Sequence, residues 1–374
     1  MEFTCERGDL FEVLGNVQTA IPSRSTHPVL SNVLLVAGPE GIKITGTDLD
    51  VSITGGVEGN SIEEGAFALP AKRTFDLLRE LGPGEVYFKR EGSRVSIEQG
   101  AGKFTVSGVE KEEYPAEEIL KEKEAEFEVD ADELSRLLSK TSFAVSADVA
   151  RIALSGLYIK FSGEKMIAVA TDGHRLTLIS RETNSAGDEI EMLIPAKTVG
   201  HLSKMLGEAA ETVKIEIGKG TARFIVDGYT LSSKLITEKF PDYEQVIPRD
   251  NTKTLIVDRG VLMQAVKRAS VLSNPMTHLV KFDVTEGKTE LSCSDYDVGG
   301  EAHDEIPVEY SDDPLPIGFN SNYLLEVLRH IESDEVKLLM KNPLSAALIY
   351  PLPQEESEEY LSILMPLRLP EEEG

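Results

Sequence analysis

The sequence contains no tryptophan, only two cysteines (Cys5 and Cys293) and no long apolar run among its 374 residues. Two thiols are too few for a disulfide framework, and their separation does not match a metal site. A membrane span needs about 18 consecutive apolar residues, so none is predicted. The first residues form neither a basic leader nor an apolar core, so we expect no secretory signal peptide. Together these absences favour the reducing cytoplasm as the compartment.

Basic residues are scarce as well. The chain has 38 Lys and Arg against 65 Asp and Glu, which gives a net charge of −27. Taken alone, this excess argues against a nucleic-acid partner, because an acidic surface repels phosphates. Hydrophobic residues make up 41% of the chain, which is enough for folded cores and excludes wholesale disorder.

Motifs of the common enzyme classes are also missing. The sequence has no phosphate-binding P-loop, no His-Glu-x-x-His zinc site, no nucleophile elbow and no Cys-x-x-Cys pair. None of the six histidines lies four residues from another, so a metal cluster is not expected. The sequence therefore predicts no catalytic residues, no metal and no cofactor.

A repeat of about 125 residues organises the chain. Apolar residues at helical spacing follow a Pro or Asn in three segments, 67–81, 194–206 and 317–331. A second marker repeats at nearly the same interval. In all three copies, a strand-like run ends in Thr-Asp or Ser-Asp. The marker aspartates are Asp48, Asp172 and Asp295. Further helices are predicted near 8–20, 131–145 and 258–273.

Short alternating runs fill the rest of each copy and are typical of antiparallel strands and hairpins. The period is far too long for a solenoid unit, so each copy is expected to be a whole domain. The predicted fold is α+β, with three repeated domains of two helices packed on antiparallel sheet. The expected domains are residues 1–120, 124–248 and 252–370. Charged Glu117–Glu124 and Pro248–Lys253 are the expected linkers, and the last four residues are expected to fray.

The few positive charges are not spread evenly. The six predicted helical segments carry 11 basic and 8 acidic residues, whereas the rest of the chain carries 27 basic and 57 acidic residues. The bland interpretation is chance, since helix faces are often charged for solubility. The functional interpretation is a set of helices that faces a polyanion while the outside repels one. Such binding would contact phosphates and be independent of base sequence.

The marker aspartates allow two interpretations. They could be carboxylates for acid–base chemistry, but an Asp that ends a strand more commonly caps a turn. One copy differs, because Gly173, His174 and Arg175 follow Asp172. Gly173 permits a positive φ, and the two polar residues are donors beside an apolar Leu176. This segment could be one wall of a binding groove, or a turn whose polar groups are all hydrogen-bonded locally. A second hypothesis is an enzyme or small-ligand binder built on Asp172 and His174. Such an enzyme would lack an evident nucleophile.

At this point the residues match a family. The threefold repeat resembles the bacterial sliding clamps, the β subunits of the DNA polymerase III holoenzyme. The segments that carry the resemblance are Ile44–Leu49, Ala170–Leu176, Phe240–Pro248, Ile317–Asn320 and Ile363–Leu369. The similarity runs from Met1 to Leu369, and the combination of TDGHRL, FPDY and MPLRL is highly specific.

The resemblance implies the DNA clamp fold and a head-to-tail homodimer, whose six domains form a ring around double-stranded DNA. Twelve helices would line the hole, which agrees with the uneven charge. It also implies a processivity factor without catalytic residues, which tethers the replicative polymerase α subunit. The clamp loader and the repair and translesion polymerases would dock through the same peptide pocket, and no membrane is involved.

Site residues follow from the resemblance by position. The partner-peptide pocket would use Leu154, Thr171, Gly173, His174, Arg175, Leu176, Pro241, Val246, Ser345, Ile363, Leu364, Met365, Pro366, Leu367 and Arg368. The DNA-facing residues would be Arg24, Arg73, Arg151 and Lys197. Gln245 stands where some members have Arg, which removes a charge at the pocket rim.

A head-to-tail ring needs two different surfaces that complement each other. The segment Lys103–Ser107 alternates, with Phe104 and Val106 on one face, and an exposed strand of this kind would invite pairing. The dimer interface is predicted to join this apolar and basic surface to an apolar and acidic one. The predicted residues are Arg94, Lys103, Phe104 and Val106 on the first domain, and Val271, Leu272, Glu301, Asp304 and Glu305 on the third. The alternative is that the apolar ones fill their own domain cores.

Overall fold

The computed structural model of the chain describes residues 1–22, 24, 26–115, 119–120, 122–183, 189–207, 210–295 and 299–369. The chain forms two compact units, and each is described by itself. Unit 1 consists of Met1–Asp132 and Lys197–Leu235, and unit 2 of Glu133–Ala196 and Ile236–Gly374. The second sequence repeat contributes to both units. Part of the linker predicted at Glu117–Glu124 and all four residues of the predicted tail lie outside the described residues.

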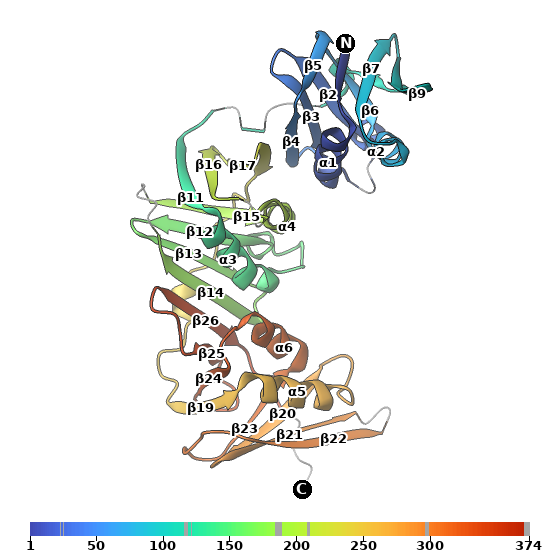
Figure 1. The fold of residues 1–374 in the computed structure, drawn as a ribbon. Coiled ribbons are helices and arrows are strands. Elements are labelled where there is room, and N and C mark those ends of the chain that lie inside the picture. The colour runs from blue at the N-terminus through green and yellow to red at the C-terminus, as the bar shows by residue number, and fades with distance from the viewer. Residues whose placement is uncertain are drawn as a thin grey trace. The chain divides into compact units, whose positions relative to one another are not determined.

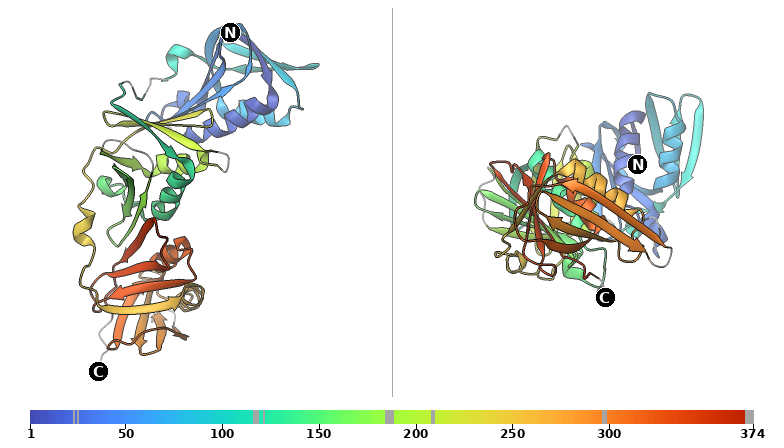
Figure 2. Two further views of the ribbon diagram at one scale, coloured as in Figure 1. Left: turned by 60° about the vertical axis from the view of Figure 1, so that its left-hand side comes forward. Right: turned by 90° about the horizontal axis from the view of Figure 1, so that it is seen from below.

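Six α-helices lie in the described chain where the apolar spacing predicts them (Figure 1). They are α1 (Arg7–Val17), α2 (Ala71–Glu80), α3 (Ala131–Thr141), α4 (Ala196–Met205), α5 (Arg259–Ser270) and α6 (Ser321–His330). The predicted ends at residues 20 and 145 include the 3₁₀ turns η1 (Gln18–Ala20) and η4 (Ser142–Ala144). Within the units, α1 packs against α2 and α5 against α6; the second pair lies together in both views of Figure 2.

Helices α5 and α6 start at residues whose side chains cap free N–H groups, whereas α1 and α2 begin without a side-chain cap. The Asn320 side chain accepts hydrogen bonds from the N–H groups of Asn322 and Tyr323, and Asp258 caps α5 in the same way. In α6 the buried side chains include Leu324, Leu325, Val327 and Leu328, which form one apolar face.

Unit 1 contains two antiparallel sheets. The five-stranded sheet has the order β5 (Gly59–Glu63), β1 (Glu2–Glu6), β7 (Glu85–Glu91), β8 (Arg94–Gln99) and β9 (Gly102–Ser107). The nine-stranded sheet has the order β10 (Val109–Glu110), β6 (Gly65–Pro70), β2 (Asn32–Gly38), β3 (Gly41–Thr47), β4 (Val51–Val57), β18 (Tyr229–Lys234), β17 (Thr221–Val226), β16 (Thr212–Gly218) and β11 (Ala125–Asp130).

Unit 2 also contains two antiparallel sheets. The eight-stranded sheet has the order β15 (Ile190–Pro195), β12 (Gly156–Ser162), β13 (Lys165–Thr171), β14 (Arg175–Glu182), β26 (Glu358–Leu364), β25 (Ala347–Leu352), β24 (Glu335–Met340) and β19 (Lys253–Asp258). The four-stranded sheet has the order β22 (Gly300–Pro307), β21 (Lys288–Asp295), β20 (Leu279–Thr285) and β23 (Leu315–Asn320).

The large sheets cross the boundaries between sequence repeats. Strand β4 of the first repeat pairs with β18 of the second, with Ile53 opposite Leu231. Strand β14 of the second repeat pairs with β26 of the third, with Leu178 opposite Leu361. The α+β prediction of two helices per repeat on antiparallel sheet is confirmed, but the sequence did not predict these shared sheets.

Candidate functional site

A tight turn links β13 to β14 and is held by its own side chains. Oδ1 of Asp172 accepts hydrogen bonds from the N–H groups of His174 at 2.8 Å and Arg175 at 3.0 Å. The Thr171 hydroxyl donates to the Arg175 carbonyl at 2.6 Å. Gly173 has a φ of +86°, which residues with a Cβ rarely adopt. The turn-capping interpretation of Asp172 is therefore confirmed.

Asp48 caps the corresponding turn of the first repeat. Its Oδ1 accepts from the N–H groups of Asp50 at 3.0 Å and Val51 at 2.7 Å. Burial alone would raise the pKa of the Asp48 carboxyl, but hydrogen bonds from Lys197 and these backbone groups leave that pKa below its usual value. The side chain of the third marker, Asp295, lies outside the described residues.

The C-terminal segment, residues 365–369, is joined to the β13–β14 turn. The Met365 N–H donates to the His174 carbonyl at 2.9 Å, directly after β26 ends. The Leu367 N–H donates to the Gly318 carbonyl of β23 at 2.8 Å. Residues 365–367 therefore lie between the turn and a strand of the third repeat.

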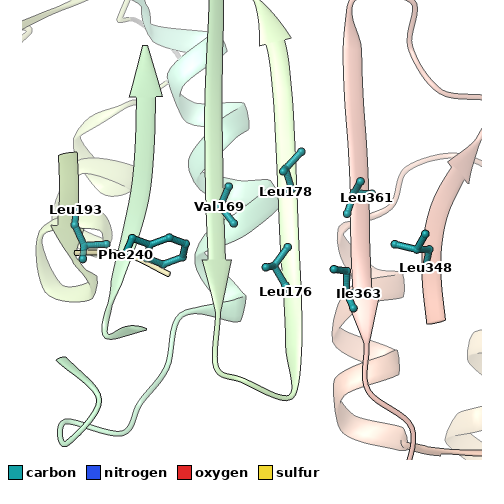
Figure 3. Packing of buried hydrophobic residues seen from close by; sticks show 8 residues of the cluster. All are labelled: Val169, Leu176, Leu178, Leu193, Phe240, Leu348, Leu361 and Ile363. Carbon is teal, nitrogen blue, oxygen red and sulfur yellow. The ribbon is translucent and has the colours of Figure 1, made fainter. Parts of the chain in front are cut away.

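An apolar floor and an exposed rim lie along this joint. Leu176 of β14 faces Ile363 of β26 across the strand pair, and each is only 3% exposed (Figure 3). Leu154 packs against the same cluster from the 3₁₀ helix η5 (Ile152–Leu154). By contrast, Val246 is 55% and Met365 is 45% exposed. This combination suits a short apolar ligand, because the rim side chains lose water only when something binds.

The segment from residue 236 to residue 247 is held on the same face of the sheet. Phe240 is buried and stacks on Tyr158 of β12, with ring centroids 5.1 Å apart. The Ile236 N–H donates to the Leu193 carbonyl of β15 at 2.9 Å, and Figure 3 shows Leu193 beside Phe240. Pro241 follows this anchor and remains exposed.

Gln245 is exposed, and its side chain forms a hydrogen bond within this segment. Its Nε2 donates to Oδ2 of Asp242 at 2.7 Å. The amide nitrogen of Gln245 is therefore engaged by a residue of its own segment.

Arg175 lies beneath the site. Its Nη1 donates to Glu326 at 2.7 Å, its Nη2 to the Phe143 carbonyl at 2.8 Å and its Nε to Asp172 at 3.2 Å. The guanidinium also lies over the rings of Tyr323, at 4.6 Å, and Phe143, at 5.3 Å. Each guanidinium nitrogen already has an acceptor, so Arg175 stabilises the turn and has little donor capacity left for a ligand.

The other predicted pocket residues differ in exposure. Gly173, His174, Pro241 and Arg368 are exposed, whereas Leu154, Thr171, Ser345, Pro366 and Leu367 are partly exposed. Leu364 is fully buried. As the strand neighbour of Ile363 it points to the opposite face of the sheet, so it does not share the apolar floor.

The four predicted DNA-facing residues do not gather in one unit. Arg24 and Arg73 are exposed in unit 1, and neither forms an ion pair within the described residues. Lys197, also in unit 1, pairs with Asp48. Arg151 lies in unit 2 and donates to the backbone of the β13–β14 turn.

The first predicted dimer surface is an exposed sheet edge. Strand β9 is the last strand of its sheet, and Phe104 on it is 37% exposed. Val106 is partly exposed and Arg94 on the neighbouring β8 is exposed. Lys103 pairs with Glu98 at 2.8 Å. This edge carries both apolar and basic side chains, and the assignment to a dimer interface stays a prediction.

The second predicted dimer surface lies at the end of α5 and on β22, another edge strand. Val271 is 79% and Leu272 is 42% exposed. The alternative that these side chains fill their own domain core is therefore wrong. The acidic residues lie on β22: Glu301 is exposed, Asp304 pairs with Arg268 at 2.5 Å, and Glu305 pairs with Lys288 at 2.6 Å.

Within the described ranges, no three His, Cys, Asp or Glu side chains are arranged to hold a metal ion. In the same residues, no helix combines the length and apolarity needed to cross a membrane.

Sequence reasoning missed Tyr323. Its ring stacks on that of His174, with centroids 6.1 Å apart. The N-cap at Asn320 could have placed Tyr323 in the first turn of a helix. Nothing local in the sequence could have shown that this turn faces residue 174.

Comparisons with known proteins cover nearly the whole chain. Three family models match in succession, described as the N-terminal, central and C-terminal domains of the DNA polymerase III beta subunit, at residues 1–118, 128–242 and 244–368. The beta sliding clamp of Caulobacter vibrioides is 33% identical over 99% of this chain and all of its own length. The solved DNA polymerase III subunit beta of Pseudomonas aeruginosa has 31% identity and a TM-score of 0.93, with 99% of this chain and all of the other covered. The solved sliding clamp of Bartonella birtlesii, bound to griselimycin, has 34% identity and a TM-score of 0.93 over the same shares.

Proposed function

Because the chain belongs to the DNA polymerase III beta subunits, the beta sliding clamps, we propose that it forms a ring-shaped homodimer around duplex DNA and holds the replicative polymerase there. A beta sliding clamp is a processivity factor without enzymatic activity of its own. We place it in the cytoplasm, where the chromosome is replicated. The proposed domains are residues 1–120, 124–248 and 252–370.

The observation that carries the tethering role is the apolar floor with an exposed rim along the β14–β26 joint. A tether needs a surface that stays available to short partner segments while the ring is on DNA. Leu176 and Ile363 provide a buried floor, and Val246 and Met365 provide an exposed rim. We propose that this pocket receives peptides of the polymerase α subunit, the clamp loader, and the repair and translesion polymerases. Griselimycin, which the solved Bartonella clamp holds, is proposed as a ligand here too.

The proposed ring closes head to tail. The β9 edge, with Phe104 and Val106, offers apolar and basic side chains, and the surface of Val271, Leu272 and β22 offers apolar and acidic ones. Two different surfaces on one chain fit a heterologous contact, which closes into a ring when the rotation permits. Opposed charges would favour the correct partner end.

DNA contacts in this proposal are diffuse and go to phosphates. Arg24, Arg73 and Lys197 of unit 1 are the proposed contacts, together with Arg151 of unit 2. Point charges on phosphates carry no base information, so binding should be independent of sequence and weaken with salt.

Retention on DNA tests the ring directly. The wild type, loaded on nicked circular DNA, should remain bound through gel filtration and be lost when the circle is cut to a linear duplex. We expect the Arg24→Ala, Arg73→Ala double variant to be loaded or retained less well on every DNA sequence. Equal retention on linear DNA, a strong sequence preference, or no loss in the double variant would count against the proposal.

Deleting Met365–Leu369 tests the pocket. This deletion removes part of the rim and the hydrogen bond to His174, so griselimycin affinity measured by calorimetry should fall by about tenfold or more. The dimer should survive, since the proposed dimer surfaces lie on other elements. Unchanged griselimycin affinity would refute the pocket assignment while leaving the ring untouched.

A further inference from the structure

We propose that Arg151 is a positioning residue of the partner-peptide pocket, whose guanidinium holds the β13–β14 turn in the conformation that presents His174. This inference rests on the proposed pocket. It gives Arg151 a second role besides the phosphate contact proposed above.

Arg151 is itself held by the loop that precedes η5. Its Nε donates to Oδ2 of Asp148 at 2.9 Å, and its backbone N–H donates to the Asp148 carbonyl at 3.1 Å. Oδ1 of Asp148 accepts the Ala150 N–H at 3.0 Å. The Ala150 N–H and the Arg151 guanidinium keep the pKa of Asp148 below its usual value. The loop therefore fixes the direction of the arginine side chain.

The other end of the guanidinium reaches the turn. Nη1 of Arg151 donates to the Asp172 carbonyl at 2.7 Å, a short charge-assisted hydrogen bond. The Asp172 side chain is already used to cap the turn, so its carbonyl is the group left for an outside partner. The contact joins two segments 21 residues apart.

Gly173 shows how closely the arginine packs on the turn. A Cβ added at this glycine would lie 2.9 Å from Nη1 of Arg151. The glycine therefore serves two needs, because its φ is positive and the guanidinium occupies the space beside it.

The same arginine also fixes a wall of the pocket through its backbone. Its carbonyl accepts the Leu154 N–H at 2.8 Å, and the Ser146 N–H donates to the Leu154 carbonyl at 3.0 Å. Leu154 packs on the apolar cluster that includes Leu176. One residue thus ties together the η5 wall and the turn that bears His174.

The planar fork of arginine is what this arrangement uses. Nε and Nη1 point to two acceptors on different segments, whereas a lysine has a single charged nitrogen on a flexible stem. A phosphate contact needs mainly the charge, and the side chain is 42% exposed, so lysine would serve that role. The conservative substitution therefore separates the two roles.

The experiment measures griselimycin affinity by calorimetry and backbone hydrogen exchange of the turn in the full-length protein. We expect Arg151→Ala to weaken griselimycin by about tenfold and to speed exchange at residues 173–175, because a charge-assisted hydrogen bond is lost. Arg151→Lys should restore neither the griselimycin affinity nor the slow exchange of the turn. If only the charge of Arg151 contacts the DNA phosphates, Arg151→Lys should restore retention on circular DNA. Lys165→Ala is the matched control, since it removes a cation at the other end of β13 and should change nothing.

Two outcomes overturn the proposal: normal affinity and exchange in Arg151→Ala, or full rescue of both by Arg151→Lys. Thermal melts of each variant establish that it is folded. If wild-type griselimycin binding proves insensitive to deletion of Met365–Leu369, the pocket assignment fails. The exchange measurement then still decides whether Arg151 holds the turn.

Discussion

The two joints between sequence repeats are built alike but supported differently. In unit 1, β4 and β18 pair over five residues, and in unit 2, β14 and β26 pair over seven. Around the first joint the supporting contacts include an exposed ion pair, Lys234 to Asp50, at 2.8 Å. Around the second joint, Arg175 is buried and donates to the β13–β14 turn, to α6 and to η4. The proposed pocket lies on the joint that has the more extensive side-chain support.

A second charged network strengthens that joint. Arg136 of α3 donates to Glu358 of β26 at 2.6 Å and pairs with Glu332 and Glu355. Glu358 also accepts from Arg181 of β14, at 3.2 Å. A pocket whose walls come from two domains needs those domains fixed, and these contacts supply that constraint. The comparison teaches that a shared sheet joins the repeats at both joints, while the second joint also carries buried and partly buried charged contacts.

The largest effect is expected at the proposed dimer interface, which would be a third joint, formed between two chains. We predict that Val271→Ala with Leu272→Ala weakens dimerisation by about a hundredfold or more, because two apolar anchors of the proposed interface are truncated. Both side chains are exposed in the single chain, so the fold should be unaffected. Sedimentation at micromolar concentration should then show folded monomers.

One control and one further variant sharpen this test. Val149 is 85% exposed in the same unit, so Val149→Ala removes a comparable apolar group elsewhere and should leave the dimer intact. Glu301→Lys should weaken the dimer in a salt-dependent way. A stable dimer in the Val271, Leu272 double variant would remove these residues from the interface.

A smaller effect should separate the two joints within the chain. Arg175→Met leaves the carboxylates of Asp172 and Glu326 without their cation and should cost about 3 kcal/mol in unit 2. Lys234→Met breaks an exposed pair and should cost less than about 1 kcal/mol in unit 1. Urea denaturation combined with hydrogen exchange in β14 and β18 measures both. Equal losses at the two joints would show that Arg175 supports the pocket no more than a surface pair does.

Local signals accounted for what the sequence could predict. Apolar spacing and N-caps such as Asn320 located the helices, and strand-ending aspartates such as Asp48 located capped turns. Strand pairing between repeats was missed, because the register of β4 on β18 depends on residues far apart in sequence.

The candidate site was predicted mainly by resemblance, which gives positions but not contacts. Arg175 looked like a ligand donor, yet its partners Phe143 and Glu326 lie 32 and 151 residues away. Leu364 was included with its neighbours, but strand alternation turns it to the opposite face. These outcomes depend on tertiary packing, which no local pattern encodes.

The smallest expected effect is a pH dependence of the stability of unit 1, which contains the first joint. His201 of α4 is 8% exposed, with Nδ1 lying 3.4 Å from the Thr19 hydroxyl, and its Nε2 is buried without a hydrogen-bond partner. Burial lowers the pKa of His201, and Lys197 and Lys204 lower it further, whereas Asp48 opposes this. The unfolded chain therefore binds the proton more readily than the folded one. The contribution of His201 to stability is complete above its ordinary pKa of 6.5 and is lost as the pH falls from there through the lowered value.

We predict that His201→Asn reduces the loss of unit 1 stability between pH 7.5 and pH 5.5, because an amide can still bond to Thr19 but does not titrate. Carboxylates that also lose stability in acid are common to both proteins, so the difference between variant and wild type isolates His201. Urea denaturation at the two pH values, followed by hydrogen exchange in β18, gives that difference. Exchange in β14 serves as the internal reference, since His201 belongs to the other unit. Parallel pH profiles in β18 for the two proteins would mean that His201 contributes nothing to the pH response of the first joint, and the contrast between the joints would then rest on buried charge alone.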